Sequence, residues 1–174
     1  MSAMAPAQII ASPLLAAGIF LLLAAALHDV ATRTIPNRLV AGVACTGLAC
    51  QFMAGNAVPA GIAGAAVLAV SLAFWRRGYL GGGDAKLLAA AALMVPANQI
   101  LSFILTTAVA GGVLSLFYLV MKGLCAASRA TTKPAARSLI ARILRIERWR
   151  LRHGIALPYA TAIAAGTVFV LWRG

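Results

Sequence analysis

Residues 100–121 read ILSFILTTAVAGGVLSLFYLVM, a run of apolar and small residues without one charge. About 20 such residues cross a bilayer as a helix. The rest of the chain has the same character, since 63% of its 174 residues are hydrophobic, 10% are charged and its mean hydropathy is +0.95. Soluble domains carry about 25% charged residues. The sequence therefore predicts a membrane protein, and its length suits a single membrane-embedded domain over residues 1–174.

Other apolar stretches repeat this pattern along the chain, and alternating strand patterns are absent. Helices are expected because lipid leaves every backbone polar group to be satisfied within the protein. The predicted fold is all-α, a polytopic membrane protein of about six transmembrane helices. The expected spans cover about residues 7–27, 39–53, 60–75, 86–95, 100–121 and 155–172.

Residues 135–153 combine apolar side chains with six arginines at helical spacing. This pattern predicts an interfacial amphipathic helix before the last span. Its arginines would face the anionic headgroups of the lipid bilayer, which is therefore an expected partner.

The formal charge of +12 comes from 15 basic residues and only three acids, Asp29, Asp84 and Glu147. Fourteen of the basic residues fall on alternate connections between the expected spans. Because loops rich in Lys and Arg face the cytoplasm, this distribution predicts both termini outside and places Asp29 and Asp84 on the cytoplasmic side. No nucleic acid partner is expected despite the basicity, since so apolar a chain offers no soluble face for a duplex.

The two aspartates border membrane spans, where an ionisable group is costly and suggests a function. Asp29 ends the first expected span. Asp84 follows three glycines and opens a segment, Asp84 to Val95, that would reach only about 18 Å of the roughly 30 Å hydrocarbon core. We therefore expect residues 81–83 to form an irregular segment that holds Asp84 at a shallow depth beside water.

Two carboxylates on one side of the membrane suggest an aspartic protease dyad. In such a pair one carboxylate takes a proton from water while the other donates a proton to the scissile carbonyl. The alternative is that each Asp caps a helix N-terminus or pairs with a neighbouring Arg. Residue chemistry alone leaves these alternatives about even.

Other chemistries have less support in the sequence. His28 and His153 have no partner at metal-ligand spacing, and the three cysteines form no zinc pattern, so neither a metal nor a cofactor is expected. No Gly-x-Ser-x-Gly occurs. Glu147 is expected to be a solvated partner of arginines on the surface helix.

Three segments resemble the motifs of type IV prepilin peptidases. DVATRTIPNRL at residues 29–39 resembles the first motif, GGGDAKL at 81–87 matches Gly-x-Gly-Asp-x-Lys-Leu, and LPYA at 157–160 through Gly166 resembles the Pro-Tyr/Phe-Gly segment of the last helix, with Ala160 where the family often has Gly. The resemblance covers essentially the whole chain, in order. This resemblance strongly favours the aspartic protease dyad over helix capping or pairing with an arginine.

This resemblance implies a membrane aspartic endopeptidase in which Asp29 and Asp84 cut the short basic leader from prepilins after a glycine. It also implies a location in the bacterial inner (cytoplasmic) membrane, with the active site facing the cytoplasm. Long members carry an insert with Cys-x-x-Cys pairs and methylate the new N-terminus. This chain has neither insert nor cysteine pairs, so it resembles the short form associated with tight-adherence (Flp-type) pili, and methyl transfer is not supported.

Further motif members are expected to support the site without an assigned chemistry. We expect Pro36 and Asn37 to shape the turn after Asp29, and Lys86 either to face headgroups or to favour ionisation of the carboxylates. The supporting set comprises Arg33, Pro36, Asn37, Gly81, Gly83 and Lys86.

Two competing functions remain. An intramembrane protease of the presenilin or signal-peptide-peptidase type also uses Gly-x-Gly-Asp, but here Asp29 is followed by Ile-Pro-Asn and the last span lacks Pro-Ala-Leu. A proton-coupled transporter would need carboxylates near the middle of the membrane. Both aspartates are instead expected at one edge.

Overall fold

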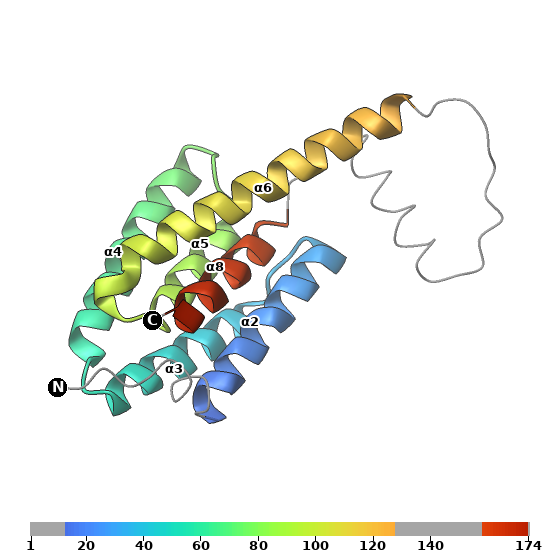
Figure 1. The fold of residues 1–174 in the computed structure, drawn as a ribbon. Helices are drawn as coiled ribbons and strands as arrows, with labels where there is room; N and C mark the ends of the chain where they lie inside the picture. Colours follow the sequence, from blue (N-terminus) through green and yellow to red (C-terminus); the bar gives the residue numbers. More distant parts are fainter. Residues whose placement is uncertain (1–12, 128–157, 174) are drawn as a thin grey trace. The chain divides into compact units, whose positions relative to one another are not determined.

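The computed structural model describes residues 13–127 and 158–173, and this part of the chain contains helices and no strand (Figure 1). The prediction of an all-α fold is confirmed. The elements are α2 (Pro13–Thr32), α3 (Asn37–Met53), α4 (Ala57–Arg76), α5 (Gly82–Ala92), the short 3₁₀ helix η1 (Ala97–Gln99), α6 (Ile100–Ala127) and α8 (Tyr159–Arg173).

Three stretches of the described chain are long and apolar enough to cross a membrane. They are α2, α4 and the segment Ala97–Met121, which holds η1 and most of α6. The apolar helix α8 is shorter, as are α3 and α5. A helical membrane protein is therefore supported, while the count of six spans stays a prediction. The predicted amphipathic helix at 135–153 lies outside the described residues.

The described residues group into two compact units. One contains everything up to Gly111 together with the chain from Pro158 onward, and the other contains the rest of α6 from Gly112. That the whole chain forms a single domain stays a prediction.

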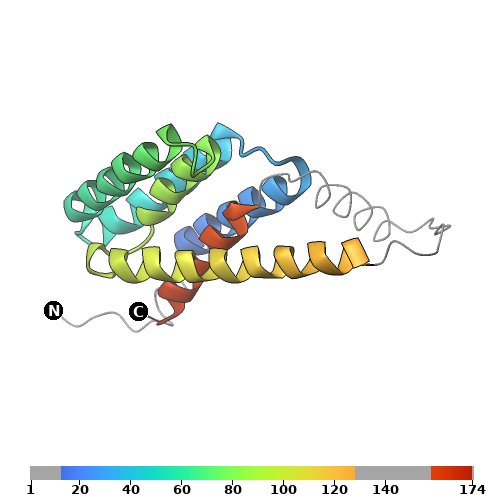
Figure 2. The same cartoon turned by 90° about the horizontal axis from the view of Figure 1, so that it is seen from above.

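Within the first unit, α5 occupies the central position and packs against α3, α4 and α8 (Figures 1 and 2). Helix α2 in turn packs against α3 and α8. Most of α5 is buried, because alanines at its centre let three neighbours approach closely. The first unit therefore surrounds the short helix that carries Asp84.

Glycines mark the closest approaches between these helices. A Cβ added at Gly47 of α3 would lie 2.9 Å from the backbone of Leu93, just past the end of α5. A Cβ at Gly166 of α8 would lie 2.9 Å from the Cα of Thr107 in α6. Small residues at such points allow backbones to meet, as is usual between membrane helices.

Two sequence expectations need correction. Helix α2 continues to Thr32, so Asp29 lies inside its last turn rather than at its end. Gly82 and Gly83 are helical, so the expected irregular segment was wrong for these two residues. Both lie against neighbouring side chains, Trp75 and Ile35, which pack around the first turn. The expected shortness of this segment is nevertheless observed, since α5 has 11 residues and a length of about 16 Å.

Candidate active site

Asp29 is a buried carboxylate in the last turn of α2. Its side chain is 6% exposed, and the backbone N–H of Ala160 in α8 donates a hydrogen bond to it. Its oxygen Oδ2 is also buried and has no hydrogen-bond partner among the described residues. Asp29 lies at the C-terminal end of its own helix and does not cap that helix, but Ala160 belongs to the first turn of α8. The Asp29 carboxylate therefore accepts from the N-terminus of α8, and the capping alternative stays open for this residue.

Asp84 lies in the first turn of α5 and is half-buried. No side-chain hydrogen bond caps this helix, so Asp84 does not serve as its cap. Burial raises the pKa of Asp84 to about 6, the negative charge of Asp29 adds to the rise, and the Arg33 guanidinium opposes it. An unperturbed aspartate has a pKa of about 4. Asp84 can therefore hold a proton much closer to neutral pH than an exposed aspartate does.

The structure thus brings the two predicted carboxylates together. They come from helices separated in sequence, yet the charge of Asp29 acts on Asp84. Asp84 also has one buried oxygen, Oδ1, without a hydrogen-bond partner in the described part of the chain. Two adjacent carboxylates in different surroundings can share one proton and so act together as acid and base.

Arg33 follows α2 directly and is the nearest cation to this pair. Its charge acts on both Asp29 and Asp84, and its side-chain atoms Nε and Nη1 are shielded from solvent. The backbone N–H of Arg33 donates to the Asp29 carbonyl oxygen at 2.8 Å. The second alternative, an aspartate beside an arginine, is therefore present in the structure, since the charge of Arg33 acts on both carboxylates.

Pro36 and Asn37 form the start of α3. Pro36 is its N-cap residue, and its carbonyl oxygen accepts the first hydrogen bonds of the helix, from Leu39 and Val40. Lys86 Nζ donates to Asn37 Oδ1 at 3.3 Å. This contact joins the first and second sequence motifs, because Lys86 follows Asp84 by two residues.

The motif glycines provide space around Asp84. A Cβ at Gly81 would lie 2.7 Å from Asp84 Oδ2, so a side chain there would displace the carboxylate. A Cβ at Gly83 would lie 3.4 Å from Ile35, in the loop after α2. The absence of a side chain at Gly81 therefore leaves space for the Asp84 carboxylate. The absence of a side chain at Gly83 instead allows the two motifs to pack closely.

His28 belongs to a polar network at the end of α2. Its Nδ1 donates to the Thr34 carbonyl oxygen at 2.7 Å and lies 2.9 Å from Thr32 Oγ1. His28 also acts electrostatically on Asp29. These contacts tie the end of α2 to the loop that carries Arg33.

Two contributions from α8 were also absent from the predicted site residues. The Ala160 backbone N–H contacts Asp29, and Tyr159 lies close enough to Asp84 to be affected by its charge. The resemblance of residues 157–160 to a family segment was the available signal. Any residue except proline could supply the Ala160 N–H, so the Gly-to-Ala departure does not prevent this contact.

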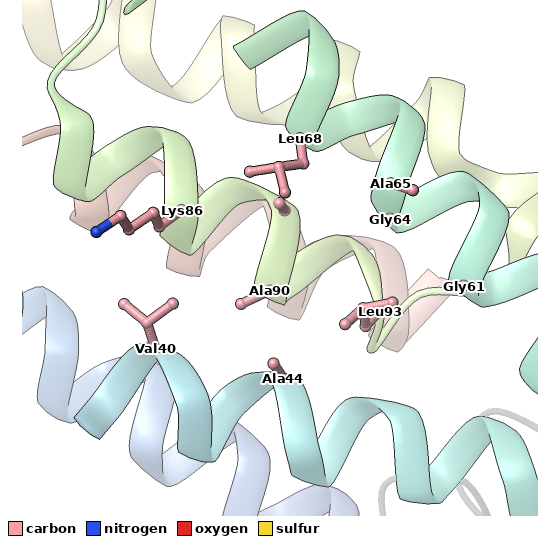
Figure 3. Close-up of a pocket in the computed structure, with 10 residues that line it drawn as sticks. Val40, Ala44, Gly61, Gly64, Ala65, Leu68, Lys86, Ala90 and Leu93 are labelled. Carbon is pink, nitrogen blue, oxygen red and sulfur yellow. The ribbon is translucent and has the colours of Figure 1, made fainter. Parts of the chain in front are cut away.

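A groove of about 340 Å³ lies between α3, α4 and α5, with Lys86 at one end (Figure 3). Helix α5 contributes Lys86, Ala89 and Ala90 to it, and Leu93 follows directly after the helix. Successive helical residues turn by about 100°, so these four residues lie on the side of α5 opposite to Asp84. The groove is therefore not the cavity of the carboxylate pair.

The described residues contain no group of three or more His, Cys, Asp or Glu side chains placed to hold a metal ion. The polar groups gathered at the site are instead two carboxylates, one guanidinium and a tyrosine hydroxyl. This set suits proton transfer.

A family model described as the type IV leader peptidase family matches residues 16–116. This range includes most of α2, all of α3 to α5 and both aspartates. No significant match was found among curated proteins or among solved structures.

Proposed function

Since the chain belongs to the type IV leader peptidase family, we propose that it is a membrane aspartic endopeptidase with Asp29 and Asp84 as its catalytic pair. Its substrate would be a Flp-type prepilin, from which it removes the short basic leader at the cytoplasmic face of the bacterial inner membrane. The observation that carries the proposal is the pair itself, a buried Asp29 and a half-buried Asp84, in which the charge of Asp29 raises the pKa of Asp84.

The chemistry requires the pair to hold one proton. The ionised carboxylate takes a proton from a water molecule, whose oxygen attacks the scissile carbonyl carbon, while the protonated carboxyl donates to the carbonyl oxygen. Collapse of the tetrahedral intermediate breaks the C–N bond as the leaving nitrogen receives a proton. The products are the leader carboxylate and the new N-terminal amine. The two apparent pKa values belong to the pair, so neither role is assigned to one residue.

The surroundings of the two carboxylates support a pair that holds one proton. The N–H of Ala160 holds Asp29 in place, and burial keeps Asp84 protonated to higher pH than usual. Both carboxylates have an oxygen without a hydrogen-bond partner in the described chain, which leaves acceptor positions for water and substrate.

The test is cleavage of a synthetic Flp-type prepilin by the purified protein in proteoliposomes. Asp29→Asn and Asp84→Asn should each lower the rate by at least about 10²-fold, because an amide can neither accept nor donate the transferred proton. Glu147→Gln is the matched control, since it neutralises the only other acid of the chain. Mapping the cut by mass spectrometry identifies the leader junction.

Full leader removal by either aspartate variant would refute the dyad. Proton flux that is abolished by Asp84→Asn, in vesicles that leave the prepilin intact, would instead favour the transporter. Cleavage within the apolar segment of the substrate rather than at the leader would favour a presenilin-like protease.

A further inference from the structure

We propose that Arg33 is a positioning residue for the carboxylate pair, whose guanidinium, held by a left-handed backbone at the end of α2, orients Asp29 and Asp84 and sets the pH range in which they share one proton. This inference rests on the proposed function, because it concerns the same pair.

The backbone of Arg33 is the first observation. Its φ is +58°, and it is the one residue other than glycine with a positive φ in the described ranges 13–127 and 158–173. Helices often end in this conformation, but the residue there is usually glycine, since a side chain adds strain. A bulky residue in this region is uncommon and persists where other interactions compensate. Ending α2 would by itself favour glycine, so the arginine side chain indicates a further role.

The position of the guanidinium is the second observation. Nε and Nη1 are shielded from solvent although they belong to a charged group. A buried charge is costly unless opposite charges lie near it. The described anions here are the two aspartates, and each has one solvent-shielded oxygen, Oδ2 of Asp29 and Oδ1 of Asp84. The cation and the pair therefore compensate one another.

The remaining titratable groups around the pair act on one member or on neither. His28 of α2 acts on Asp29, and the Tyr159 hydroxyl of α8 faces the charge of Asp84. Lys86 of α5 donates to Asn37 of α3 instead. Arg33 alone acts on both carboxylates among these groups.

The sign of the effect follows from its charge. A positive charge favours the ionised form of a carboxyl, so Arg33 opposes the rise in the pKa of Asp84. Removing the charge makes the pair keep its protons to higher pH. Since cleavage needs one ionised and one protonated member, the whole bell-shaped profile of rate against pH should move to higher pH.

Four variants separate the charge from the backbone. Arg33→Gly and Arg33→Asn both suit a positive φ and so retain the turn, but they lack the charge. Arg33→Lys keeps the charge. Arg38→Asn is the matched control, because Arg38 lies on the exposed start of α3.

We expect the cleavage profile to move up by about one pH unit or more in Arg33→Gly and Arg33→Asn, the size of effect that a neighbouring arginine has. Arg33→Lys should restore most of the wild-type position, and Arg38→Asn should not shift the profile.

A second measurement does not depend on cleavage. The chain has only two aspartates, so labelling with [γ-¹³C]aspartate gives two side-chain carboxyl signals, which the Asp29→Asn and Asp84→Asn variants assign. The midpoint of the Asp84 signal, expected near 6 in the wild type, should rise in Arg33→Gly and Arg33→Asn. It should stay near the wild-type value in Arg33→Lys and in Arg38→Asn.

The outcomes are distinct. If Arg33→Gly has the wild-type pH profile and the wild-type midpoint of the Asp84 signal, the inference is overturned. It is also overturned if Arg33→Gly loses rate at every pH while neither the profile nor the midpoint shifts. If the wild type does not cleave prepilin but the midpoint still moves, the proposed function fails while the role of Arg33 stands.

Discussion

At the scale of single residues, the site depends on how little space surrounds the Asp84 carboxylate. Gly81 has an ordinary extended backbone, with φ −68° and ψ 143°, which alanine can adopt. Its lack of a side chain is nevertheless required, because a Cβ there would lie 2.7 Å from Asp84 Oδ2. Gly81 thus contributes space for the carboxylate rather than backbone freedom.

We expect Gly81→Ala to lower the rate of leader cleavage by about 10²-fold, since displacing a reacting group by about 1 Å has effects of this size. Stability should change little, because a mobile side-chain end rather than the backbone has to move. Gly83→Ala, whose Cβ would meet Ile35 at 3.4 Å, should cause a smaller loss. Cleavage kinetics and thermal unfolding of both variants check this, and equal losses in the two would argue against the steric explanation.

The sequence predicted the residues of the pair but not their surroundings. Asp29 and Asp84 could be found because the chain has only three acids, two of them beside apolar runs. The Ala160 N–H could not be found in this way, since every residue except proline has a backbone donor. The shared position of Arg33 depends on a left-handed turn, which side-chain pattern alone does not reveal.

At the scale of helices, the sequence predicted where segments begin and end better than how they pack. The expected stretch at 39–53 matches α3 to within two residues at its start, whereas α2 is longer than expected at its C-terminal end. The central place of α5 could not be predicted. Membrane helices are apolar on all sides, so their hydrophobic pattern does not indicate which face meets protein and which meets lipid.

The packing of α5 gives a prediction of its own. Gly47→Ala should destabilise the protein by about 1–3 kcal/mol, because the new methyl group would meet the Leu93 backbone, which cannot rotate away. Gly61→Ala in α4 is the matched control, since nothing lies within 4 Å of a Cβ there, and it should be neutral or stabilising by up to about 1 kcal/mol. Thermal unfolding in detergent, followed by circular dichroism, measures both. Equal melting temperatures for the two variants would contradict the close contact.

At the scale of the whole molecule, the geometry and the charge distribution group the same two connections together. Many large apolar side chains are exposed on the described helices, which suits contact with lipid. Examples are Phe20, Ile62, Leu101 and Val109. The pair joins the C-terminal end of α2 to the N-terminal end of α5, so the connections at 33–36 and 77–81 lie at one end of the helices. The basic residues of the sequence predict that these same connections face the cytoplasm.

This agreement predicts the accessibility of single cysteines placed in the loops. In a background with Cys45, Cys50 and Cys125 replaced by alanine, Thr34→Cys and Tyr79→Cys should react with a membrane-impermeant maleimide only in inverted vesicles. Asn56→Cys and Asn98→Cys, also exposed, should react only in right-side-out vesicles, because α3 carries the chain about 25 Å away from the carboxylate end. Labelling of Thr34→Cys and Tyr79→Cys from opposite sides would contradict the joining of α2 and α5 at one end. Labelling of both from outside would preserve the pair but reverse the orientation inferred from charge, and would place leader cleavage on the wrong side for a cytoplasmic precursor.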